Sequence, residues 1–97
     1  MKRESNSQTL GEVMQALVKA YKLGPKLNEV RLVGIWEETF GKPIAKHTND
    51  IKLRGTTLVV ELDSSVVREE LSYAKQQIIE TLNKEMGQEV VTEVIFR

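Results

Sequence analysis

The sequence predicts an α+β domain in which helices cover one face of a small three-stranded sheet, in the order ααββαβ. The first observation is periodicity: apolar residues recur at helical spacing before residue 41 and again over about 65–86, but alternate with polar residues from 51. The second is size, because 97 residues can form one core but not a core plus a deep catalytic cleft. Residues 9–97 are therefore expected to be a single domain, behind a polar, disordered tail at residues 1–8.

The first predicted helix begins at a capping box formed by Thr9 and Glu12. The threonine hydroxyl is expected to accept from an N–H of the first turn, and the carboxylate to reach back to the cap. Gly24-Pro25 is expected to end this helix. Its apolar residues fall on one face and are Leu10, Val13, Met14, Leu17, Val18 and Tyr21.

The second predicted helix covers about 26–40 and ends at Gly41. Gly34 lies inside it, where glycine costs about 1 kcal/mol relative to alanine. The missing side chain would let another backbone or a partner approach closely beside Trp36. The residues expected on the apolar side of this helix are Leu27, Val30, Ile35, Trp36 and Phe40.

A β-hairpin is predicted next, with a glycine-containing turn at 54–56 between strands at 51–53 and 58–62. Asp63-Ser64-Ser65 offers three candidate N-caps for one long helix that reaches about Met86. Gly87 ends this helix, and residues 90–96 form the last strand. The buried stripe of the long helix is expected to be Val67, Leu71, Ala74, Ile78 and Leu82.

Composition excludes several classes of protein. The chain has no cysteine, which excludes disulfides, thiol catalysis and cysteine-ligated metals. It has no apolar run of the roughly 20 residues that span a bilayer, and its N-terminus lacks the apolar core of a signal peptide. A cytoplasmic protein without a membrane partner is therefore expected.

The net charge of zero hides an asymmetry between the two halves of the chain. Residues 1–54 hold ten Lys or Arg and six Asp or Glu, for +4, whereas residues 55–97 hold four and eight, for −4. Within 42–54 the four cations face only one acid, which favours a cationic patch around the hairpin. Solvated charges with no function explain the same counts equally well.

Catalytic constellations are absent from the sequence. The single histidine, His47, has no cysteine or second histidine to act with, and is predicted to be a partly exposed turn residue rather than a ligand or acid–base group. No nucleotide-binding glycine motif occurs, and the serine, histidine and acidic residues are scattered without a nucleophile elbow. We therefore expect no enzyme, no cofactor, no metal and no small-molecule substrate.

Two features remain as candidate binding sites. Basic residues near the hairpin could contact nucleic-acid phosphates, and Trp36 is either a core residue or a partly exposed anchor for a protein partner. Gly34 belongs to the second candidate because it leaves space beside the indole. The candidate nucleic-acid residues are Lys42, Lys46, His47, Lys52, Arg54 and Arg68.

Several segments together resemble the DciA family, bacterial proteins once known only as a domain of unknown function and later identified as loaders or operators of the replicative DNA helicase. The resemblance covers about residues 8–97. Its segments are Gly34-Ile35-Trp36-Glu37-Glu38-Thr39-Phe40-Gly41, Ile44-Ala45-Lys46-His47-Thr48, Leu58-Val59-Val60-Glu61-Leu62-Asp63-Ser64-Ser65, Arg68-Glu69-Glu70-Leu71 and Leu82-Asn83 with Gly87.

This resemblance implies a fold similar to the type II KH domain and a non-enzymatic role in DNA replication. The implied partners are the replicative helicase, with the family's important tryptophan at Trp36, and DNA, held weakly through phosphates by basic residues. The Gly-x-x-Gly loop of true KH domains is missing, since no two glycines are three apart. The alternatives are a KH-like RNA- or DNA-binding module without a helicase partner, and a structural domain that dimerises through its sheet edge.

Overall fold

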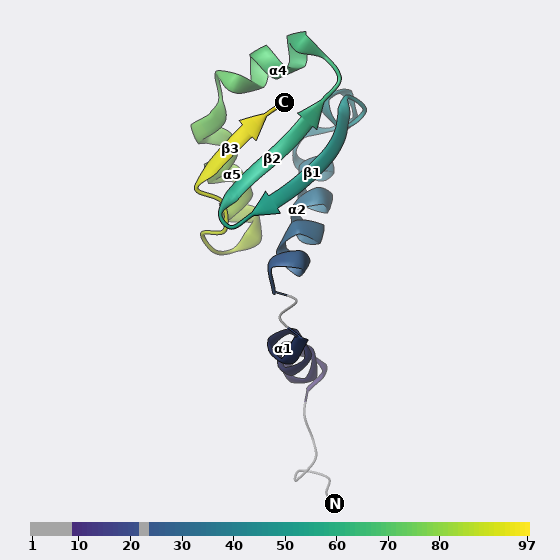
Figure 1. The fold of residues 1–97 in the computed structure, drawn as a ribbon, viewed down its shortest axis with the longest axis vertical. Helices are drawn as coiled ribbons and strands as arrows, with labels where there is room; N and C mark the ends of the chain where they lie inside the picture. Colours follow the sequence, from purple (N-terminus) through teal and green to yellow (C-terminus); the bar gives the residue numbers. More distant parts are fainter. Residues whose placement is uncertain (1–8, 22–23) are drawn as a thin grey trace, which may run out of the picture.

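The computed structural model describes residues 9–21 and 24–97, and the predicted tail at 1–8 lies outside these residues. Helices pack on a three-stranded mixed sheet, so the predicted α+β class is confirmed (Figure 1). In chain order the elements are α1 (Leu10–Tyr21), α2 (Gly24–Phe40), α3 (Lys42–Ala45), β1 (Thr48–Arg54), β2 (Thr57–Leu62), α4 (Ser65–Ser72), α5 (Lys75–Met86) and β3 (Glu93–Phe96).

The sheet has the order β1-β2-β3, with β1 antiparallel to β2 and β2 parallel to β3. A tight turn at Gly55 and Thr56 joins β1 to β2, and Gly55 has a φ of 63°, which glycine adopts without steric cost. The helices α2 and α5 lie behind the sheet in Figure 1, and α4 crosses one end of it. The opposite face of the sheet is not covered by any helix of the described chain.

The core forms where the inner face of the sheet meets α2 and α5. Alternate residues of the central strand β2 point inward, so that Leu58, Val60 and Leu62 are buried while Glu61 is exposed. Each such buried side chain contributes about 1.5–3 kcal/mol relative to an exposed one. The core is completed by Leu32, Trp36, Ile51, Leu71, Ile78, Leu82, Met86, Val90, Val91 and Val94.

The buried face of α2 differs from the predicted one. Leu27 and Val30 are 37% and 57% exposed, whereas Leu32, which is not among the residues predicted for the apolar side, is 1% exposed beside Trp36. Only the second half of α2 packs under the sheet. The first half passes the free edge of β1, where Glu29 accepts a hydrogen bond from the Leu53 N–H. Gly24-Pro25, expected to end the first helix, instead begins α2.

The predicted long helix is two helices, α4 and α5, separated at Tyr73 and Ala74. Ala74 has φ −120° and ψ 23°, outside the helical region, and the Ser72 hydroxyl donates back to the Glu69 carbonyl. Such back-bonding by serine competes with the helix hydrogen bonds and bends helices. The break lets Leu71 and Ile78 both reach the core.

The last strand begins at Glu93, three residues later than predicted. Val90 and Val91 are buried but belong to a loop. Their backbone groups form hydrogen bonds with the Asn83 side chain instead of with a neighbouring strand. The Asn83 oxygen accepts from the N–H groups of Val90 and Val91, and the amide donates to the Val91 carbonyl. One α5 side chain thus satisfies three buried backbone groups.

Candidate functional site

Trp36 is a core residue, since only 1% of it is exposed. Its indole N–H donates to the Thr48 hydroxyl at 3.0 Å, and that hydroxyl donates to the Ile44 carbonyl at 2.9 Å. The ring also lies 4.6 Å from the Phe40 ring and 6.3 Å from the Phe96 ring, between centroids. Of the two interpretations of Trp36, the structure supports the core residue, because an indole this buried presents no surface to a partner.

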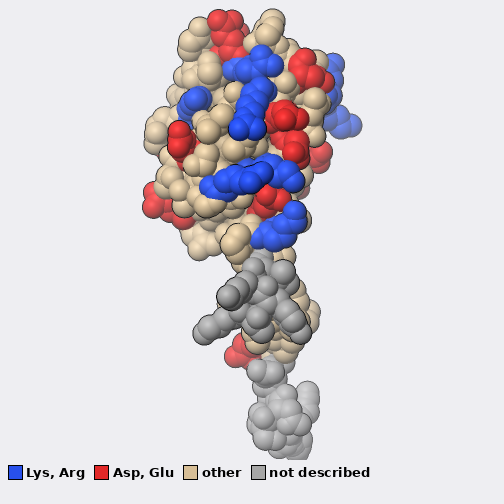
Figure 2. Space-filling view, viewed as in Figure 1, with Lys and Arg blue, Asp and Glu red and all other residues tan. Residues whose placement is uncertain are grey.

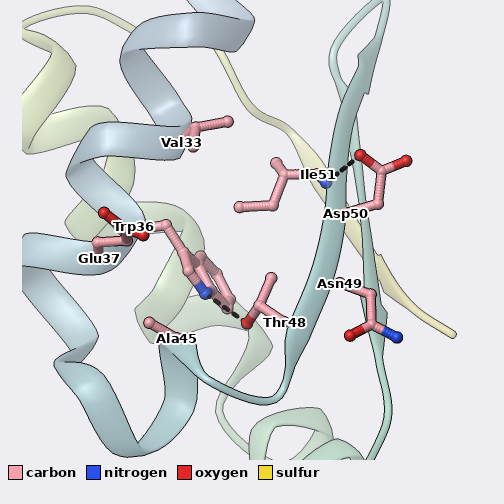
Figure 3. Close-up of a pocket in the computed structure, with 8 residues that line it drawn as sticks. All are labelled: Val33, Trp36, Glu37, Ala45, Thr48, Asn49, Asp50 and Ile51. Atoms are coloured by element: carbon pink, nitrogen blue, oxygen red, sulfur yellow. Dashed lines mark hydrogen bonds between the residues drawn. The ribbon is translucent and has the colours of Figure 1, made fainter.

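A small surface cavity of about 170 Å³ lies between α2 and the start of β1 (Figure 3). Trp36 forms part of its wall, and Val33, which is 39% exposed, stands at its α2 side. The other lining residues are Glu37, Ala45, Thr48, Asn49, Asp50 and Ile51. The buried indole therefore borders this cavity through its wall, although almost none of its own surface is exposed.

Gly34 lies on the exposed side of α2, one residue from the cavity residue Val33. A Cβ built at Gly34 would meet no other atom within 4 Å. No backbone of the described chain therefore needs this glycine, and the idea of a close internal approach is wrong. Approach by a partner at Gly34 remains a prediction.

His47 is held in the turn between α3 and β1 by Asp63. Its Nδ1 lies 2.7 Å from the Asp63 carboxylate, and its carbonyl accepts from the Asp63 N–H at 2.9 Å. These contacts tie the start of β1 to the end of β2. The predicted turn position is confirmed, with the side chain 35% exposed.

The structure separates the predicted nucleic-acid residues into two groups. Lys42 and Lys46 are exposed at α3, beside the first residue of β1, whereas Lys52 and Arg54 are exposed near the end of that strand. Thr48 and Arg54 are the two ends of this seven-residue strand, so about 20 Å separates them. These cations can contact successive phosphates of an extended strand, but not one phosphate group.

Lys52 and Arg54 share the open face of the sheet with Arg97, which is not among the predicted nucleic-acid residues. Alternation along β1 places them on the outer face, while Ile51 is buried and Leu53, between the two cations, is half-buried against the core. Figure 2 shows Lys and Arg side chains in a band across this face, with Asp and Glu beside them. The groove here has a volume of about 400 Å³ and is lined by Asp50, Lys52, Arg54, Val59, Glu61 and Arg97.

Arg68 is turned toward the protein. One terminal nitrogen donates to the Leu62 carbonyl at 3.2 Å, at the end of β2, and its Nε is buried without a partner in the described residues. The residue lines a second groove, between α4 and Phe96, rather than the open sheet face. The structure therefore does not bring Arg68 together with Lys52 and Arg54.

Glu29 has a structural role at the free edge of β1. The hydrogen bond from the Leu53 N–H, and next the contact with Lys26 at 2.9 Å, lower the pKa of the Glu29 carboxyl below its ordinary value of 4.5. The carboxylate accepts from the Leu53 N–H, a donor at the strand edge with which an additional strand would otherwise pair. Sequence alone gave no indication of this contact, which joins residues 24 apart.

Within residues 9–21 and 24–97, no cluster of three or more potential metal ligands occurs. No helix of the described chain is long and apolar enough to cross a membrane. The surface has a cavity of about 170 Å³ beside α2 and a charged face on the sheet. The fold defines a small α+β domain.

Comparison with known proteins gives the particular family. The family model described as "Dna[CI] antecedent, DciA" matches residues 9–96, so the chain belongs to the DciA family. A UPF0232 protein of Rhodococcus jostii (strain RHA1) is 27% identical over 88 residues, which are 91% of this chain. The matched region is 47% of that relative, so the chain spans about half of its length.

Proposed function

We propose that this protein is a non-enzymatic adaptor in DNA replication, which binds the replicative DNA helicase and DNA and assists helicase loading in the cytoplasm. The observation that carries the proposal is the DciA family match over residues 9–96, nearly the whole described domain. Because that family is associated with helicase loading, the helicase is the partner to test first.

The helicase-binding surface is assigned to the cavity beside Trp36. It combines exposed apolar surface at Val33 with a rigid wall, since the indole is fixed by Thr48 and by the Phe40 ring. Rigid pockets beside a buried aromatic group suit an inserted side chain at the centre of an interface. Gly34, next to Val33 and without a side chain, allows the partner's backbone to approach α2.

The DNA-binding surface is assigned to the two groups of exposed cations along β1. Lys52, Arg54 and Arg97 on the open sheet face, with Lys42, Lys46 and His47 beyond the other end of the strand, supply contacts to phosphates but no pattern for reading bases. The acids Asp50 and Glu61 within the same groove limit the attraction. Weak DNA binding that depends strongly on salt is the expected result.

A loading assay tests the proposal. The amount of replicative helicase bound to single-stranded DNA is measured with and without the full chain, in parallel with Val33→Glu and with Lys52→Glu/Arg54→Glu. We expect the wild type to increase loading and both variants to lose most of the increase. The control is Val66→Glu, a change at an exposed apolar residue of α4 that lines neither the cavity beside Trp36 nor the groove on the sheet face. Unchanged helicase loading in the presence of folded wild type would contradict the proposal.

The alternative function, a nucleic-acid module without a helicase partner, is favoured by the exposed cations alone. It predicts salt-dependent binding of DNA or RNA by a protein that does not associate with the helicase. If Lys52 and Arg54 both contact phosphates of a single strand, replacing them with neutral residues should make the plot of log binding constant against log salt concentration shallower. The magnitude of its negative slope should fall by about 1.4.

A further inference from the structure

The strand β3 forms one edge of the sheet, with backbone groups that face outward (Figure 1). The Arg97 N–H donates to the Val60 carbonyl and the Arg97 carbonyl accepts from the Leu62 N–H, so Arg97 faces β2. Because successive backbone groups of a strand point to opposite sides, the N–H and carbonyl groups of Val94 and Phe96 face away from β2. In residues 9–21 and 24–97, no other group forms a hydrogen bond with these outward backbone atoms.

The opposite edge, at β1, is closed by other parts of the chain. The Leu53 N–H donates to the Glu29 carboxylate at 2.9 Å, and the Ile51 N–H donates to the Asp50 carboxylate at 3.0 Å. The helix α2 also contacts this strand. At the other edge, a groove of about 510 Å³ between α4 and Phe96 leaves space beside β3. Since native sheets commonly block an edge that must not pair, β3 is the edge open to another strand.

The five residues from Glu93 to Arg97 are complementary to the same segment read in the opposite direction. With Ile95 at the centre, Glu93 lies opposite Arg97, and Val94 lies opposite Phe96. Glu93, Ile95 and Arg97 lie on the outer face of the sheet, because alternation along the strand places Val94 in the core. Both charged side chains are exposed there. An antiparallel copy of the segment would therefore form two Glu–Arg pairs on one face.

We propose that β3 pairs with β3 of a second copy of this chain, antiparallel, about a two-fold axis beside Ile95. Such an interface requires every contact to be repeated in reverse, which the symmetric segment allows. Antiparallel strands alternate between residue pairs that exchange two hydrogen bonds and residue pairs that exchange none. In this register the outward-facing Val94 and Phe96 form the hydrogen-bonded pairs, whereas Ile95, which faces β2, forms a pair without hydrogen bonds. Backbone geometry and charge thus select the same register.

A neighbouring register uses fewer of the free backbone groups. Pairing centred on Val94 would place Phe96 opposite Thr92, whose N–H already donates to the Thr56 carbonyl. It would also place the Glu93 carboxylate opposite Ile95 instead of Arg97. The register centred on Ile95 therefore satisfies more hydrogen-bonding groups and more charges.

The dimer has one continuous sheet, with the helices α2 and α5 of both copies on the same side. This follows because a two-fold axis perpendicular to the sheet keeps the outer faces of both copies together. Lys52 and Arg54 belong to β1, at the far edge of each copy, so they stay accessible. Dimerisation and the proposed DNA contacts can therefore be tested separately.

Charge swaps test both the dimer and its register. Light scattering after gel filtration measures the mass of the full chain over a series of concentrations for the wild type, Glu93→Arg and Arg97→Glu. We expect the wild type to approach twice the monomer mass, and each variant alone to dimerise about tenfold more weakly, because both pairs become pairs of like charge. An equimolar mixture of the two variants should dimerise about as strongly as the wild type, since a heterodimer has opposite charges at both pairs.

Amide exchange measured by NMR tests the hydrogen bonds themselves. The N–H groups of Val94 and Phe96 should exchange more slowly as the concentration of the wild type rises. The Arg97 N–H, which already bonds to the Val60 carbonyl, should change little with concentration. Exchange at Val94 and Phe96 that does not depend on concentration would overturn the proposed pairing.

Both substituted side chains are exposed, so circular dichroism should show each variant folded. The double variant Glu93→Arg/Arg97→Glu restores both pairs in reverse and should dimerise like the wild type. Glu38→Arg is the matched control, because it makes the same change at an exposed residue of α2, a helix that contacts β1 at the opposite edge. A wild type that stays monomeric, single variants that dimerise as tightly as the wild type, or a mixture that dimerises no better than its components would each overturn the proposal.

Discussion

The helices α1 and α5 are each 12 residues long and each carry apolar residues along one face, yet their environments are opposite. Ile78, Leu82 and Met86 of α5 are between 0% and 5% exposed under the sheet. Leu17, in the middle of the α1 face, is 44% exposed. A helical pattern of apolar residues therefore shows that a helix has a face to bury, but not what covers that face.

The apolar faces of α5 and α1 therefore contribute differently to the stability of the domain. The α5 face stabilises the domain itself, since it closes the core against β3 and α2. The α1 face is available to another molecule, as is the cavity beside Trp36. Substitutions on the apolar face of α5 should therefore destabilise the domain, and substitutions on the apolar face of α1 should leave its stability nearly unchanged.

The largest effect is expected from a matched pair of leucine truncations. Leu82→Ala should lower the free energy of unfolding by about 3 kcal/mol, because it leaves a cavity in the packed core. Leu17→Ala, measured by urea unfolding at low protein concentration, should change it by less than about 0.5 kcal/mol. A large loss of stability in Leu17→Ala would contradict the claim that the α1 face does not contribute to the core.

Asn83 is a polar residue of α5 that also stabilises the domain, through hydrogen bonds to the loop before β3. Asn83→Ala should cost about 2 kcal/mol, since the N–H groups of Val90 and Val91 lose their acceptor in a buried loop. Thermal unfolding measures the loss. Gln76→Ala, on the exposed side of the same helix, is the control and should stay within about 0.5 kcal/mol of the wild type.

The N-caps of α1 and α4 should also differ in their effect on the stability of the domain, by a smaller amount. Thr9 and Glu12 form the predicted capping box, with hydrogen bonds of 2.9 and 3.0 Å, and the Ser64 hydroxyl accepts from the Val67 N–H at the start of α4. Either change to alanine should cost about 1 kcal/mol. For Ser64→Ala the loss should appear in global unfolding. For Thr9→Ala the loss should appear as faster amide exchange confined to α1. If both variants lowered the free energy of global unfolding equally, α1 would not be independent of the core.

The smallest effect concerns how the first half of α2 is attached to the sheet. Since the pKa of Glu29 is lowered in the folded state, its ionised form adds stability above the ordinary value of 4.5, and this stability is lost as the pH falls through the lowered value. Glu29→Gln should therefore be about 0.5–1 kcal/mol less stable near neutral pH, and the gap should close in acid. Urea unfolding at several pH values measures this, with the exposed Glu38→Gln as the control; a gap that is independent of pH would contradict the assignment.

Local patterns predicted much of the fold. The capping box, the turn at Gly55, the position of His47 and the end of α5 at Gly87 depend on neighbours in sequence, and the structure has each of them. The misplaced features depend on tertiary contacts. Leu32 rather than Leu27 is buried because only half of α2 lies under the sheet, and β3 is short because Asn83 holds the preceding loop.

The candidate site was predictable in its residue types but not in its geometry. The tryptophan and the cations stand out in the sequence, but the separation of Lys46 from Arg54 along β1, the inward turn of Arg68 and the position of Arg97 follow from the sheet. Thr48, which accepts the Trp36 N–H, was visible only as part of a family segment. Hydrogen bonds between distant residues leave no periodic pattern in a sequence.

The most direct test of the adaptor function is capture of the purified replicative helicase by immobilised full-length chain. Trp36→Ala is a poor probe, since removing a buried tryptophan costs about 3–5 kcal/mol and confuses unfolding with loss of docking. Val33→Glu alters the cavity rim without opening the core, and Val66→Glu is the control. We predict that the wild type and Val66→Glu capture the helicase and folded Val33→Glu does not. Failure of the folded wild type to capture it would contradict the adaptor function, and equal capture by Val33→Glu would contradict the assigned surface.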